Sequence, residues 1–85
     1  MRHATSTALD ELEPLLDRLR AVPPLIERKR GIFYRGSKAF LHFHEDASGL
    51  YADVRFDVEF ERLRVQTPEE CDALLTRILL HAGIR

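Results

Sequence analysis

The sequence predicts an α+β fold, a two-layer sandwich in which an antiparallel four-stranded meander carries an N-terminal and a C-terminal helix on one face (α-β-β-β-β-α). Apolar residues recur at helical spacing near both ends of the chain. Between them, residues 31–65 alternate apolar and polar side chains, and short Gly, Ser and Asp clusters interrupt the alternation as in β-hairpins. A sheet with one apolar face and two amphipathic helices can cover one another, which gives the two layers.

The composition is that of a small globular protein. The 85 residues suffice for one domain over 1–85 with a modest core, and we expect residues 1–6 to be disordered. The 13 basic and 14 acidic residues balance, so no basic field attracts nucleic acid or an anionic membrane. No apolar run approaches the ~20 residues that span a bilayer. The single cysteine, Cys71, excludes an intramolecular disulfide and a CxxC zinc site, and we expect a cytoplasmic protein.

The C-terminal helix has clear start and stop signals. Thr67 is the expected N-cap, Pro68 occupies the first helical position, and Glu70 completes a capping box. Gly83 is the expected stop. One apolar stripe then follows helical spacing and predicts a core-facing side: Cys71, Leu74, Leu75, Ile78, Leu79 and Ala82.

The N-terminal helix is expected over roughly residues 8–21, and its start depends on Pro14. If Asp10 is the N-cap, Pro14 falls in the first turn, where it costs no hydrogen bond. If the helix begins at Ser6 or Thr7, Pro14 should kink it. Pro23 and Pro24 end the helix in either case.

Four strands are expected at roughly 31–35, 39–45, 50–56 and 60–65. A four-residue turn at 46–49 pairs Leu41 with Val54 and His42 with Asp53, because residues opposite one another share a face. A slip of one residue would place Asp53 beside Leu41 in the core, which disfavours that register. The expected inner face, covered by the helices, comprises Ile32, Tyr34, Ala39, Leu41, Phe43, Leu50, Ala52, Val54, Phe56, Leu63 and Val65.

The expected outer face contains aromatic, imidazole and charged side chains: Phe33, Phe40, His42, His44, Tyr51, Asp53, Arg55, Arg62 and Arg64. In this register His42, Asp53 and Arg64 form a row across three strands. The two histidines of the stretch "AFLHFHED" therefore lie outside the core.

A metal site or a catalytic site on this face is one hypothesis. Alternate residues of a strand lie ~6.5–7 Å apart, so His42 and His44 can share an ion with Asp53 as a third ligand. Arg55 and Arg64 would repel a cation, however, and we assign no metal or other cofactor. A His–Asp pair also suits a general base, but no nucleophile is well placed, so an enzyme is not expected. Pairing on a solvated face explains the same residues, at ~0.2–1 kcal/mol for each pair.

Binding through the outer face is the favoured hypothesis. The aromatic and arginine side chains resemble the stacking platform of single-strand RNA binders, but the charge balance disfavours nucleic acid. A protein partner or a second copy of the domain suits the face better. The predicted function is thus a non-enzymatic binding or self-associating domain, and the alternative is a small-molecule or metal-dependent site around His42, His44 and Asp53. The candidate binding residues are Phe40, His42, His44, Tyr51, Asp53, Arg55 and Arg64.

The run "GIFYRGSKAFLHFHEDASGLYADVRFD" resembles small bacterial single-domain proteins of unknown function, chiefly through "FYRGSKAFLHFHED". The resemblance covers the central hairpins and the last helix, and it implies no activity, cofactor or catalytic residue.

Overall fold

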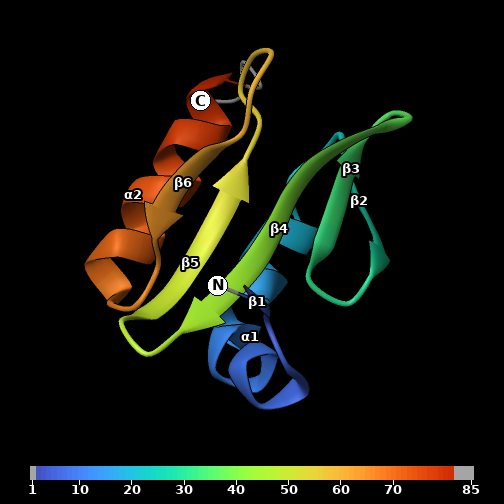
Figure 1. Ribbon diagram of the computed structural model, residues 1–85. Helices are drawn as coiled ribbons and strands as arrows, with labels where there is room; N and C mark the ends of the chain where they lie inside the picture. Colours follow the sequence, from blue (N-terminus) through green and yellow to red (C-terminus); the bar gives the residue numbers. More distant parts are fainter. Residues whose placement is uncertain (1, 82–85) are drawn as a thin grey trace.

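The computed structural model describes residues 2–81, which form two helices and one antiparallel sheet (Figure 1). The elements are β1 (Arg2–His3), α1 (Ser6–Arg20), β2 (Leu25–Lys29), β3 (Ile32–Arg35), β4 (Lys38–Asp46), β5 (Gly49–Val54), β6 (Glu61–Arg64) and α2 (Pro68–His81). The strand order is β2-β3-β4-β5-β6, and β1 pairs with β4. Both helices lie on the same face of the sheet, which confirms the predicted α+β meander between two helices (Figure 1).

The meander contains one more strand than the predicted four. β2 pairs with β3 at the edge of the sheet, from Leu25 opposite Arg35 to Lys29 opposite Ile32. Its sequence, LIERK, is rich in charged residues and does not alternate apolar and polar side chains, so the residues alone did not indicate a strand. An edge strand needs only one paired side, and charged residues suit such an edge.

The first helix begins at Ser6, and Pro14 lies inside it. The N-cap is Thr5, whose hydroxyl accepts a hydrogen bond from the Ala8 N–H. Of the two alternatives, the start at Ser6 is therefore the one observed, and Asp10 is not the cap. The Glu45 carboxylate in β4 accepts hydrogen bonds from both the Thr5 N–H (2.7 Å) and the Thr5 hydroxyl (2.9 Å). A contact 40 residues away along the chain therefore helps to set where this helix starts.

The predicted start of the second helix is confirmed. The Thr67 hydroxyl accepts from the Glu70 N–H (3.1 Å), and the Glu70 carboxylate accepts from the N–H groups of Thr67 (3.0 Å) and Gln66 (2.9 Å). These bonds satisfy donors that the helix itself cannot pair. The predicted stop at Gly83, and Ala82 of the apolar stripe, lie outside the described residues.

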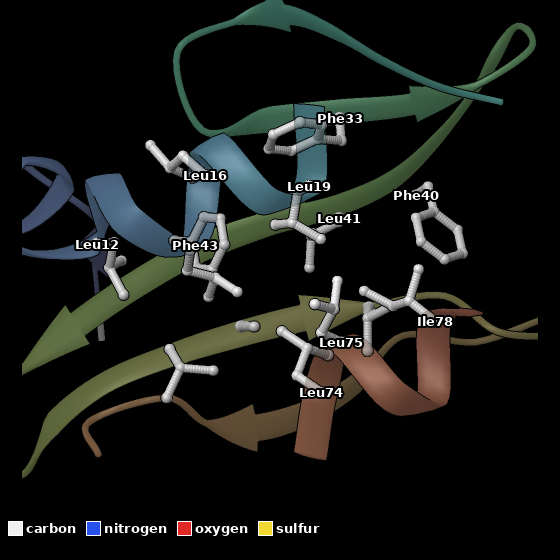
Figure 2. Packing of buried hydrophobic residues seen from close by; sticks show 14 of the residues in the cluster. Leu12, Leu16, Leu19, Phe33, Phe40, Leu41, Phe43, Leu74, Leu75 and Ile78 are labelled. Atoms are coloured by element: carbon white, nitrogen blue, oxygen red, sulfur yellow. The ribbon is translucent and has the colours of Figure 1, made fainter. Parts of the chain in front are cut away.

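The core lies between the inner face of the sheet and the two helices (Figure 2). Leu12, Leu16 and Leu19 of α1 point toward the sheet on one side of the cluster. Leu74, Leu75 and Ile78 of α2 meet the same face on the other side. The helical stripes predicted from spacing are therefore the buried faces of both helices.

The predicted register of the central hairpin is confirmed. Leu41 lies opposite Val54, and His42 lies opposite Asp53. Leu41 and Val54 are fully buried, as is Ala52 on the same face. The turn at 46–49 holds this register, because a one-residue slip would bring the Asp53 carboxylate into the core.

The predicted phase of β3 is wrong. Phe33 was expected on the outer face, but it lies opposite Leu41 and is fully buried, so Ile32 and Tyr34 point outward instead. The β3–β4 ladder shifts by one residue at Phe40, which is therefore an extra residue, a β-bulge. The bulge allows Phe40 (4 % exposed) and Leu41 to be buried together, which a regular strand forbids (Figure 2). The burial of Phe33, Phe40 and Leu41 together offsets the cost of the broken ladder.

The register between β5 and β6 differs from the prediction by two residues. Asp53 lies opposite Arg62, not Arg64, and Arg64 lies opposite Tyr51. A shift of two keeps each side chain on its predicted face, so Leu63 still packs against the core and Val65 is buried. The shift arises because β5 ends at Val54, which leaves a loop over 55–60 that is longer than the predicted turn.

Candidate metal centre

Strand alternation places two imidazoles side by side on the outer face. Leu41 and Phe43 of β4 are buried in the core, so His42 and His44 between them point to the opposite side. The neighbouring strand β5 contributes Asp53 directly opposite His42. His42, His44 and Asp53 thus converge from two strands, and we call them the His–His–Asp cluster.

The three side chains are close enough to share one ion. One ligand atom from each residue lies within 4.8 Å of the other two, and His44 Nε2 is 3.6 Å from Asp53 Oδ2. A tetrahedral ion with bonds of about 2.1 Å separates its ligand atoms by ~3.4 Å. The separations of up to 4.8 Å exceed this value by roughly 1.4 Å at most, so the side chains must rotate to share one ion.

The imidazole nitrogens of the cluster have no partners within the protein. His42 Nδ1 and both ring nitrogens of His44 are shielded from solvent and make no hydrogen bond to any residue over 2–81. The distance of 3.6 Å from His44 to Asp53 is beyond hydrogen-bond range. Buried polar atoms of this kind are usually satisfied, because each one left alone costs free energy. An ion bound through one nitrogen of each ring would satisfy two of these three atoms.

The protonation states suit a cation. Burial lowers the pKa of His42 and His44 below the ordinary imidazole value, and the Asp53 carboxylate opposes this shift in both. Both rings are therefore mainly neutral at pH 7, which is the form that ligates a metal. Hydrogen bonds from Arg62 lower the pKa of Asp53, so its carboxylate is ionised.

Arg62 already pairs with the carboxylate of the cluster. Its Nε and Nη2 atoms donate to the two oxygens of Asp53 at 2.7 and 2.8 Å, which is a bidentate ion pair. Asp53 is 8 % exposed, whereas the Arg62 side chain is 46 % exposed. The arginine can therefore move toward solvent while the carboxylate stays in the site.

The loop over 55–60 forms one wall of the cluster. The Phe60 ring stacks on His42 with centroids 5.0 Å apart and planes at 10°. The Arg55 guanidinium lies 4.9 Å from the Phe60 ring centroid, on the scale of a cation–π contact. The sequence prediction missed Phe60 because it expected a short turn here, and only the longer loop brings this ring over the outer face.

The strand at the N-terminal end forms another wall. His3 of β1 lies opposite His44, and its ring centroid is 4.6 Å from that of His44 and 5.7 Å from that of His42. The sequence prediction placed His3 in a disordered segment, residues 1–6, whereas Arg2 and His3 pair with β4. Recognition of Thr5 as the helix N-cap would have left residues 2–4 as a separate extended segment, and that was the available signal.

The remaining predicted binding residues do not join the cluster. Phe40 is buried on the inner face of the sheet, beside Phe56 and His81, so its placement on the outer face is wrong. The Tyr51 hydroxyl bonds to the Ser48 hydroxyl (2.7 Å). Arg55 donates to the Ala39 carbonyl (2.5 Å), and Arg64 reaches Glu70 of α2 (3.4 Å).

Cys71 is placed as a packed, protonated thiol and not as a reactive nucleophile. Its Sγ lies 3.5 Å from the Val65 carbonyl oxygen, to which it donates, and it packs against the core. Burial raises the pKa of Cys71, so the reactive thiolate is disfavoured at neutral pH.

Comparison with protein-family models, curated proteins and solved structures gave no significant match to this chain. Neither helix within residues 2–81 has the length and apolar character needed to cross a membrane. The candidate site is therefore interpreted from its geometry and chemistry.

Proposed function

We propose that this protein binds a divalent transition-metal ion on the outer face of its sheet, through His42, His44 and Asp53. The observation that carries the proposal is the convergence of three ligand atoms within 4.8 Å, together with shielded imidazole nitrogens that have no protein partner over the described residues. Two imidazoles and one carboxylate favour zinc and its first-row neighbours over magnesium or calcium, which prefer all-oxygen sites.

Arg62 does not preclude an ion. A carboxylate oxygen has a second lone pair, so Asp53 can ligate a metal while it still accepts from a guanidinium. The half-exposed arginine can also leave the pair when an ion neutralises the carboxylate. Metal binding then exchanges one cation for another beside Asp53, so the site never holds a buried carboxylate without a counter-charge.

Titration of the untagged protein with Zn²⁺, followed by the imidazole NMR signals, tests the proposal. We expect the signals of His42 and His44 to shift at one ion per chain, and Mg²⁺ to leave them unchanged. His81 is the internal control, because it packs on Phe40 and Phe56 in the helix layer, away from the cluster. Unchanged His42 and His44 signals at millimolar zinc would contradict the proposal.

Association with a protein partner or a second copy of the domain is the second candidate. The loop over 55–60 exposes Val58 (79 %) and Phe60 (42 %) beside the outer face, where Tyr51 and Arg64 also lie. Apolar side chains next to arginine and tyrosine are typical of interface cores. Either function suits the cytoplasm, since a single cysteine cannot form an intramolecular disulfide.

Light scattering of the wild type and of Val58→Asp distinguishes self-association from binding to a different protein. Self-association through the loop predicts a mass that rises with concentration in the wild type and stays monomeric in the variant. A wild type that remains monomeric at millimolar concentration would leave only a different protein as the partner.

A further inference from the structure

His3 stands beside the His–His–Asp cluster with no role in the function proposed so far. Its backbone pairs with that of His44, and cross-strand partners in an antiparallel pair project from the same face. The ring is exposed, so it can turn about its side-chain bonds without disturbing the core. These features place a third imidazole at the edge of the candidate metal site.

We propose that His3 is the fourth ligand of the ion, so that the site is a closed His₃Asp centre that fastens β1 onto β4. This inference rests on the proposed metal-binding function. It assigns the ion a structural or sensing role, because catalytic centres of zinc keep one coordination position open for water or substrate.

The spacing of the three rings fits one shared ion. When two imidazoles bind the same tetrahedral ion with bonds of about 2.0–2.1 Å, their ring centroids lie roughly 5 Å apart. The observed centroid separations are 4.6 Å for His3 and His44, 4.8 Å for His42 and His44, and 5.7 Å for His3 and His42. All three centroid separations therefore lie within about 1 Å of that value. His3 is not in the group of ligand atoms within 4.8 Å of one another, so its exposed ring must turn to bring a nitrogen onto the ion.

The attachment of β1 is weak without an ion. The strand contains only Arg2 and His3, and the bond from the Ala4 N–H to the Phe43 carbonyl (3.1 Å) continues the pairing. Arg2 pairs with Glu45 at 3.0 Å, but its side chain is 73 % exposed, and exposed ion pairs contribute little. An ion that joins His3 to His42, His44 and Asp53 would tie this segment to two strands of the sheet.

The same ion would steady the start of α1. Thr5, the N-cap of α1, lies two residues after His3, and both its N–H and its hydroxyl bond to Glu45, next to His44. Metal binding, attachment of β1 and capping of α1 thus act on one short stretch of β4. Binding of the ion would therefore control how firmly residues 2–5 are held against the sheet.

Calorimetry with Zn²⁺ and visible absorption with Co²⁺, on untagged wild type, His3→Ala, His44→Ala and His81→Gln, test the inference. We expect one ion per chain in the wild type and in His81→Gln. His3→Ala should bind at least about tenfold more weakly, since even loss of an outer-shell partner costs 10–100-fold. The tetrahedral cobalt spectrum of the wild type should be altered in His3→Ala. Hydrogen exchange of the Ala4 amide should slow on zinc addition in the wild type and not in His3→Ala.

The outcomes separate the inference from the function on which it rests. If wild type and His3→Ala bind zinc equally and give the same cobalt spectrum, His3 is not a ligand, while the three-residue site stands. A stoichiometry of one ion per two chains would also overturn the closed site within one chain. If the wild type binds neither ion, both proposals fail. Thermal unfolding without metal checks that His3→Ala folds, which its exposed position leads us to expect.

Discussion

The chemistry of the outer face depends on Asp53, whose carboxylate is ionised. It is almost buried, and Arg62 supplies its only ion pair through a guanidinium at 2.7 Å among the described residues. A buried charge without a partner is costly, so a cation beside Asp53 stabilises the folded protein. Arg62 and a metal ion can each supply that positive charge, and each repels the other.

Replacement of Arg62 by methionine should strengthen zinc binding by about tenfold or more, because a unit positive charge close to the ion is removed. The metal-free variant should unfold at a lower temperature than the wild type, and zinc should raise its melting temperature by more than it raises that of the wild type. Calorimetry and thermal unfolding measure the two effects.

Arg64→Met is the matched control for this prediction. Arg64 lies on the same face of β6, but it is opposite Tyr51 and reaches Glu70, so its loss should leave zinc affinity within about twofold. Weaker zinc binding in Arg62→Met would indicate that Arg62 instead orients Asp53 as an outer-shell donor.

At the scale of elements, the β-bulge in β4 decides which aromatic side chains are available to a ligand. It turns Phe40 into the core, where its ring lies 6.1 Å from that of Phe56. Only His42 and His44 of this strand then face outward as rings. The outer face consequently loses Phe33 and Phe40, and the imidazoles and carboxylate of the cluster lie there with Phe60 at their margin.

Truncation of Phe40 to alanine should lower the free energy of unfolding by about 3–5 kcal/mol, as expected for a buried phenylalanine. Phe40→Leu should cost about 1.5 kcal/mol or less, and it remains measurable if the alanine variant does not fold. Tyr51→Ala, on the outer face, should cost about 1 kcal/mol. Urea denaturation measures the free energy of unfolding of all three variants. A Phe40→Ala variant as stable as the wild type would contradict the burial of Phe40.

The ion pair between α1 and β2 joins the helix layer to the edge of the sheet. Arg20 donates to both oxygens of Glu27, at 2.5 and 3.1 Å, and Glu27 also accepts from the Gly31 N–H at 2.8 Å. The hydrogen bonds from Arg20, together with that from Gly31, lower the pKa of Glu27 below its ordinary value of 4.5.

This shift makes the contact sensitive to acid. A carboxyl group whose pKa is lower in the folded state stabilises the protein above its unfolded pKa and loses that contribution as pH falls through the folded value. Wild type should therefore be more stable than Glu27→Gln at pH 6–8, and the difference should shrink below about pH 4.5. Urea denaturation of both proteins from pH 3 to 8 measures this, and a difference independent of pH would contradict it.

At the scale of the whole molecule, the proposed ion connects β1, at the start of the chain, to the distant hairpin of β4 and β5. An 85-residue domain has a small core, so each long-range tie is a large share of its stability. A ligand that binds only the folded chain stabilises it by mass action.

Zinc at about 100 times its dissociation constant should stabilise the protein by ~2.7 kcal/mol. For a domain of this size that corresponds to a rise in melting temperature of roughly 10–20 °C. A chelator should reverse the rise, and the double variant His42→Ala, His44→Ala should show none. An equal rise in the double variant would mean that zinc stabilises the fold from another place.

Much of this fold followed from local patterns in the chain. The capping residues Thr67 and Glu70 set the start of α2, and the turn at 46–49 set the pairing of His42 with Asp53. The cluster could be anticipated because alternation and a single turn relate its three residues. His3 and Phe60 could not, since each reaches the outer face through a segment whose path depends on distant contacts.

By itself, the sequence determined the two-layer arrangement, the helical stripes and the sheet face on which His42, His44 and Asp53 lie, because periodicity and turn chemistry act over a few residues. Only the tertiary structure decided that Phe33 and Phe40 are buried, that Arg62 rather than Arg64 pairs with Asp53, and that β1 brings His3 to the cluster. The physical reason is that alternative bulges, loop paths and short edge pairings differ little in local free energy. The packing of the whole core therefore selects among these alternatives.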